Sequence, residues 1–110
     1  MSAGVAEDRR QNPRVECDGE AWLRVGPDDY PCALRTLSIG GASIAEPVRL
    51  PPAGTEVRCT LRVEDIVVRN LTAQLVDMPN GKPAVLFVDL ADADRERLVE
   101  VVRLLSDKAQ

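Results

Sequence analysis

The sequence predicts an all-β domain that ends in one helix, with the strands forming a six-stranded antiparallel β-barrel. Short runs of alternating apolar and polar residues recur up to Leu90, and Gly, Pro, Asn and Asp separate them. After Leu90 the apolar spacing changes to that of a helix. Strands this short leave exposed edges in an open sheet, and closure into a barrel removes those edges.

The length of 110 residues fits one domain with a modest core. We expect residues 1–9 to form a flexible N-terminal tail and residues 10–110 to form the folded domain. Within this domain, the barrel is predicted over about residues 14–90 and the C-terminal helix over about residues 91–108.

The first strand is predicted over residues 15–25, where Ala21, Leu23 and Val25 share one face and Gly19 indicates a bulge. Residues 26–29 (Gly-Pro-Asp-Asp) predict a turn. By the same alternation, the other strands are expected over residues 30–37, 42–45, 56–64, 66–77 and 84–90.

Two connections and the helix have their own signals. The prolines of residues 46–54 predict a loop, and Asn80-Gly81 predicts a hairpin turn. Asp92 is the expected N-cap of the helix. One apolar stripe at helical spacing should face the core: Leu98, Val101, Val102 and Leu105.

The composition disfavours several classes of function. A net charge of −4 argues against a general DNA- or RNA-binding protein, which needs a basic face. The absence of His removes the commonest general base and metal ligand, so we expect neither an enzyme nor a metal site. The three cysteines lack metal-site spacing and are expected to be small buried hydrophobes. Without an apolar span or a signal peptide, the expected location is the cytoplasm, with no membrane insertion.

The candidate site combines two stretches. In Thr36-Leu-Ser-Ile-Gly-Gly41, the glycines Gly40 and Gly41 permit positive φ and close approach of a ligand, and Ser38 adds a hydroxyl. Ahead of the first strand, residues 9–14 read Arg-Arg-Gln-Asn-Pro-Arg. On its own this arm is equally well explained as a polar tail. The same Arg-x-x-x-Arg spacing recurs at Arg58 and Arg62, where strand alternation indicates a solvated surface.

An Arg-x-x-x-Arg arm followed by [Asp/Asn]-x-Ser-x-x-Gly resembles the PilZ domain, a bacterial receptor module for the second messenger cyclic di-GMP. The resemblance covers most of the chain and implies a PilZ-type barrel with no catalytic residues and no cofactor. Arginine suits this ligand because it pairs with phosphate, binds the O6/N7 edge of guanine and stacks on bases. Matched position by position, it implies these ligand-binding residues: Arg10, Arg14, Thr36, Ser38 and Gly41, with Arg9 and Gly40 beside them.

Thr36 departs from the pattern, because it occupies the place of Asp or Asn. Losing one good polar pair to a base costs about 1–3 kcal/mol, so we expect binding to be weakened or retained. The resemblance implies a receptor that signals to an as yet unidentified protein target, in processes such as motility or biofilm formation. The alternative is a degenerate PilZ adaptor that binds no nucleotide and acts through protein–protein interaction.

Overall fold

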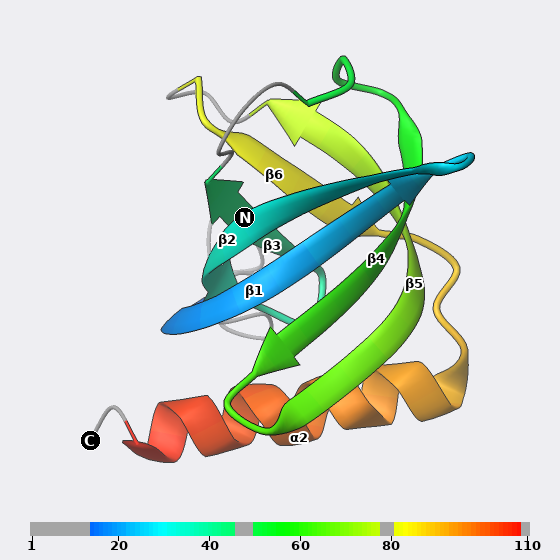
Figure 1. Cartoon of the computed structure of the whole chain (residues 1–110). Helices are drawn as coiled ribbons and strands as arrows, with labels where there is room; N and C mark the ends of the chain where they lie inside the picture. Colours follow the sequence, from blue (N-terminus) through cyan, green and yellow to red (C-terminus); the bar gives the residue numbers. More distant parts are fainter. Residues whose placement is uncertain (1–13, 46–49, 78–80, 109–110) are drawn as a thin grey trace, which may run out of the picture.

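The computed structural model describes residues 14–45, 50–77 and 81–108, and these form a closed antiparallel barrel with one helix (Figure 1). The order of strands around the barrel is β1-β2-β3-β6-β5-β4. The strands are β1 (Val15–Val25), β2 (Asp28–Leu37), β3 (Gly41–Ala45), β4 (Glu56–Val63), β5 (Ile66–Asp77) and β6 (Pro83–Phe87), and the helix is α2 (Asp92–Lys108). The predicted six-stranded barrel with a C-terminal helix is therefore confirmed.

The alternating apolar residues of the strands fill the inside of the barrel. On β4, Val57, Cys59, Leu61 and Val63 are all buried, while Arg58 and Arg62 between them are exposed. This pattern arises because successive side chains of a strand point to opposite faces of the sheet. Arg62 forms an ion pair with Glu20 on β1, so the second Arg-x-x-x-Arg copy belongs to the solvated outer surface, as predicted.

The bulge predicted at Gly19 is present. Between Glu16 and Gly19, β1 advances three residues while β2 advances two, from Thr36 to Leu34. A Cβ atom at Gly19 would lie 2.6 Å from the carbonyl oxygen of Arg62 on β4, so the bend brings two backbones too close for any side chain.

Several element boundaries differ from the predictions, including the starts of β3 and β6, which lie one residue earlier than expected, at Gly41 and Pro83. The turn after β1 contains only Gly26 and Pro27, because Asp28 and Asp29 already pair with Val25 and Arg24 in the sheet. The guanidinium of Arg24 bonds the carboxylate of Asp29 at 3.0 Å, which lowers the pKa of Asp29. The last strand ends at Phe87, and β4 ends at Val63.

Helix α2 lies across one end of the barrel, below it in Figure 1, and closes the core there. Leu98, Val101 and Val102 are buried in the same cluster as the strand residues, and Leu105 packs against that cluster. The carbonyl of Ala91 accepts the first helical hydrogen bond, from the N–H of Arg95 at 3.0 Å. Ala91 is therefore the N-cap and the prediction of Asp92 was wrong by one position, although the Asp92 carboxylate still lies in the first turn.

Some predicted features fall on residues that the structure does not describe. The predicted tail, residues 1–9, lies wholly outside the described residues, as do part of the predicted loop 46–54 and Asn80 of the predicted hairpin. The hairpin itself is consistent with the pairing of Asp77 with Pro83. In the part of the chain that is described, no helix is long and apolar enough to cross a membrane.

The cysteines are free thiols, with Cys32 and Cys59 buried and Cys17 half-buried. Burial, with a smaller contribution from nearby Cys32, raises the pKa of the Cys59 thiol from 9.0 to about 12. Between those two pH values the unfolded chain loses this proton while the folded chain keeps it. Stability from this group is therefore fully present below pH 9.0 and is lost as the pH rises toward about 12.

We expect Cys59 to make the free energy of unfolding fall by about 1.4 kcal/mol per pH unit within this window. Urea unfolding of the wild type and Cys59→Ala across the window measures the effect. The variant loses stability at every pH because it leaves a cavity, but its stability should decline less steeply with pH. Equal slopes for the two proteins would contradict the assignment.

Candidate ligand-binding site at the β2–β3 turn

The turn between β2 and β3 is closed by the side chain and backbone of Ser38. Its N–H donates to the carbonyl of Gly41 at 2.8 Å, and its hydroxyl donates to the same oxygen at 3.2 Å. The hydroxyl also accepts a hydrogen bond from the N–H of Gly41 at 3.2 Å, and Ser38 is only 8% exposed. Ser38 therefore holds the backbone of the turn in place, and its hydroxyl is committed to Gly41.

The backbone of the two glycines of the turn has no positive φ. Among the described glycines, Gly26, Gly54 and Gly81 have positive φ, and neither Gly40 nor Gly41 does. The positive φ that this pair permits is therefore not used in the turn. Gly41 is needed for space instead, because a Cβ atom there would lie 2.4 Å from the carbonyl oxygen of Val85 on β6.

Gly40, unlike Gly41, has free space around its Cα atom. It is exposed, and a Cβ atom built on it would have no neighbouring atom within 4 Å. Its carbonyl accepts a hydrogen bond from the N–H of Phe87 at 3.0 Å, whereas its own N–H has no hydrogen-bond partner among the described residues. A free backbone N–H on an exposed turn is a suitable donor for an anion.

Thr36 lies on the outer face of the barrel, where its hydroxyl forms a 2.6 Å hydrogen bond with the hydroxyl of Ser43 on β3. On its other side, Thr36 is paired with Glu16 of β1. The described outer surface next to the turn is therefore a row of three polar side chains from three adjacent strands, Glu16, Thr36 and Ser43.

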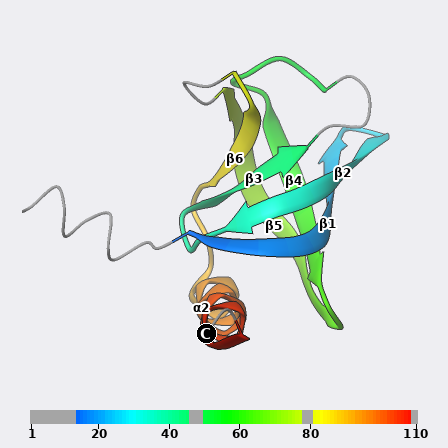
Figure 2. The ribbon, with the colours of Figure 1, turned by 90° about the vertical axis from the view of Figure 1, so that its left-hand side faces the viewer.

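Arg14 is exposed and directly precedes β1. Its neighbour Val15 pairs with Leu37, the residue before Ser38, so Arg14 and the turn lie at the same end of the β1–β2 pair. Figure 2 shows the start of β1 next to the end of β2 and the connection to β3. Arg9 and Arg10 lie outside the described residues. The fold thus gathers five of the seven predicted site residues: Arg14, Thr36, Ser38, Gly40 and Gly41.

Sequence reasoning missed two residues of this row, Glu16 and Ser43. Each lies between apolar residues of its strand, but nothing in the sequence puts either of them beside Thr36. If the register of the β1–β2 turn continued without a bulge, Glu16 would pair with Leu37. The bulge before Gly19 shifts the register by one residue, so Glu16 pairs with Thr36 instead. Among the described residues, no group of three or more acidic, Cys or His side chains is arranged to hold a metal ion.

Fold and site together define a small six-stranded β-barrel module with an exposed polar site at one strand end. The chain belongs to the PilZ family: the model of the PilZ domain matches residues 8–104. This match confirms the resemblance that the sequence motifs indicated.

Solved structures of PilZ domains share the fold. The PilZ domain with c-di-GMP of YcgR from Escherichia coli has a TM-score of 0.75 at 14% identity, covering 92% of this chain and 94% of that chain. A crystal structure of YcgR in complex with c-di-GMP from Escherichia coli has a TM-score of 0.73 at 16% identity, covering 92% and 47% of the two chains. The PilZ domain of CeSA from a cellulose-synthesizing bacterium has a TM-score of 0.58 at 15% identity, covering 89% and 99%. No match was found among curated proteins.

Proposed function

We propose that this protein is a cyclic di-GMP receptor that binds the dinucleotide at the start of β1 and the β2–β3 turn, and that it passes the signal to a protein target in the cytoplasm. The observation that carries the proposal is the convergence of Arg14 with the Ser38–Gly41 turn at one end of the barrel, in a chain of the PilZ family. Two of the neighbouring structures in this family carry c-di-GMP.

Each proposed contact has a chemical reason. Cyclic di-GMP has two phosphates and two guanines, and an exposed guanidinium such as that of Arg14 pairs with a phosphate or with the O6/N7 edge of guanine. The free N–H of Gly40 adds a donor for a phosphate oxygen at the same end of the barrel. Arg9 and Arg10 are proposed to complete the clamp from the preceding residues.

Ser38 and Gly41 have an indirect role in this proposal. Their mutual hydrogen bonds fix the turn, and the absence of a side chain at Gly41 lets β3 lie close to β6. The turn thus presents Gly40 in a fixed position, so less entropy is lost on binding. Thr36 contributes through its hydroxyl, which retains hydrogen-bonding capacity after its bond with Ser43.

Calorimetric titration with cyclic di-GMP tests the proposal in wild type, Arg14→Ala and Arg58→Ala. Hydrogen bonds to charged groups contribute about 1.5–3 kcal/mol, so Arg14→Ala should weaken binding roughly 10- to 150-fold. Arg58→Ala is the matched control, because it removes the same charge from an exposed site opposite Arg24, near the other end of β1. Its affinity should stay close to that of the wild type.

Two results would overturn the receptor proposal. One is an equal loss of affinity in both variants, which would indicate a general charge effect. The other is no binding by the wild type up to about 100 μM ligand, a limit of roughly −5.5 kcal/mol. The second result would favour the adaptor alternative. In that case the hydroxyls of Thr36 and Ser43 are satisfied by their mutual hydrogen bond and need no ligand.

A further inference from the structure

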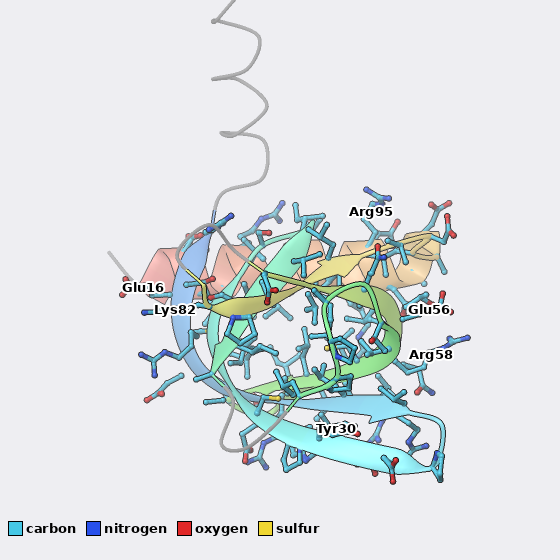
Figure 3. The ribbon with its side chains drawn as sticks, turned by 90° about the horizontal axis from the view of Figure 1, so that it is seen from above. Glu16, Tyr30, Glu56, Arg58, Lys82 and Arg95 are labelled. Carbon is cyan, nitrogen blue, oxygen red and sulfur yellow. The ribbon has the colours of Figure 1, made fainter. Side chains whose placement is uncertain are left out.

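The exposed carboxylate beside Thr36 has no structural role among the described residues. Glu16 is paired with Thr36 across β1 and β2, and Cβ atoms of directly opposed residues lie about 4.5–5.5 Å apart. Val15 before it is buried, so Glu16 points outward, and Figure 3 shows it at the outer side of the barrel. Glu16 forms no hydrogen bond or ion pair with any described residue.

The remaining site residues are poorly equipped to bind one particular edge of guanine. The Watson–Crick edge of guanine presents two adjacent donors, N1–H and N2–H₂, which need two acceptor oxygens in one plane. Arg14 has only donors. The hydroxyl of Thr36, which is bonded to that of Ser43, offers only one acceptor oxygen, and the hydroxyl of Ser38 is bonded to Gly41. A carboxylate has two acceptor oxygens in one plane and no donor, so it is complementary to this edge.

We propose that Glu16 determines the base specificity of this site by accepting hydrogen bonds from N1–H and N2–H₂ of one guanine of cyclic di-GMP. Arg14, at the same end of β1, then contacts a phosphate or the O6/N7 edge. This inference rests on the proposed receptor function and deepens it, because the arginines alone do not distinguish a guanine dinucleotide by its Watson–Crick edge.

The direction of the change in affinity distinguishes a Glu16 that binds the ligand from a Glu16 that only lies nearby on the surface. The ligand carries two negative charges, so a bystander carboxylate nearby repels it. Removing the charge of a bystander would therefore leave the affinity unchanged or raise it. Replacing a direct carboxylate acceptor by the amide of glutamine lowers the affinity, because one acceptor oxygen becomes an NH₂ donor that faces a donor of the base.

The experiment compares Glu16→Gln with Asp18→Asn in calorimetric titrations with cyclic di-GMP and with cyclic di-AMP. Asp18 is the matched control: it is also an acid of β1, two residues further along, and its substitution removes the same charge. Glu16→Gln should weaken cyclic di-GMP binding roughly 5- to 150-fold, while Asp18→Asn should bind as well as the wild type or more tightly. Circular dichroism melts check that both variants are folded.

Cyclic di-AMP and a rescue variant sharpen the test. Adenine lacks both the N1–H and the N2 amino group, so the wild type should prefer cyclic di-GMP and Glu16→Gln should lose much of that preference. In Glu16→Gln/Thr36→Asp the carboxylate is moved to the neighbouring strand at the paired position, and part of the affinity for cyclic di-GMP should return.

The possible outcomes distinguish this inference from the function on which it rests. If the wild type binds cyclic di-GMP and Glu16→Gln binds as tightly as Asp18→Asn, the role of Glu16 is rejected and the receptor function stands. An unchanged preference over cyclic di-AMP in Glu16→Gln would reject it as well. If the wild type does not bind cyclic di-GMP at all, the receptor function itself is rejected, and the inference with it.

Discussion

Gly41→Ala is expected to destabilise the barrel and to weaken ligand binding, while Gly40→Ala leaves stability nearly unchanged. The Cβ atom added by Gly41→Ala would lie 2.4 Å from the carbonyl oxygen of Val85, and a backbone atom within a sheet cannot move aside without moving its strand. The β3–β6 pairing has only three registered pairs, Gly41 with Leu86, Ala42 with Val85 and Ser43 with Ala84. Overpacking typically costs about 1–3 kcal/mol, and we expect the upper part of that range at this short strand pairing.

Thermal unfolding monitored by circular dichroism, together with titration of both variants, measures these effects. A loss of about 3 kcal/mol in a domain of this size lowers Tm by roughly 12 °C or more. Gly40 has no positive φ and open space around it, so Gly40→Ala isolates the effect of a methyl group on the ligand. Weaker binding at unchanged Tm would support close approach of the ligand to Gly40. A Gly41→Ala protein as stable as the wild type would show that β3 and β6 can move apart without cost, contrary to the steric argument.

Leu98→Ala is expected to have the largest effect on stability, because Leu98 is fully buried between α2 and the barrel. Removing a large buried side chain costs about 2–5 kcal/mol, through lost burial and the cavity that remains. Natural domains are stable by only about 5–15 kcal/mol, so this change removes a large share of the total.

Leu104 on the same helix provides the control, since it is 47% exposed. Leu104→Ala keeps the helix propensity and removes little buried area, so its effect should stay within about 0.5 kcal/mol. Urea unfolding of both variants gives the comparison. Similar losses for the two leucines would mean that α2 is not docked through the Leu98 face, which would contradict the fold described above.

The ligand-binding role of the site residues is a prediction, which can be tested first on the residues that the structure describes. Arg10 belongs to the Arg-x-x-x-Arg arm and Arg9 directly precedes it, and both lie outside the described residues. The titrations of Arg14→Ala and Glu16→Gln do not depend on their placement, because both substituted residues are described and lie at the same end of β1. If these titrations succeed, Arg10→Ala becomes the natural next variant.

The sequence by itself determined the strands, the helix and the segments that form the proposed site. Alternation of apolar residues fixed β1 and β5 to the residue, since burial on one face requires a period of two. The helical spacing of Leu98, Val101 and Val102 likewise predicted the buried stripe of α2. These signals are local, so a single sequence is sufficient to read them.

The tertiary structure decided which of these residues are neighbours. Gly41 is required because β6 approaches it, and Glu16 lies beside Thr36 because a bulge shifts the register by one residue. Both facts depend on pairing between strands that are far apart in the sequence, and a change of one residue in register alters every contact beyond it. The motif therefore located the proposed site along the chain, whereas the closure of the barrel and the bulge of β1 determined which side chains surround it.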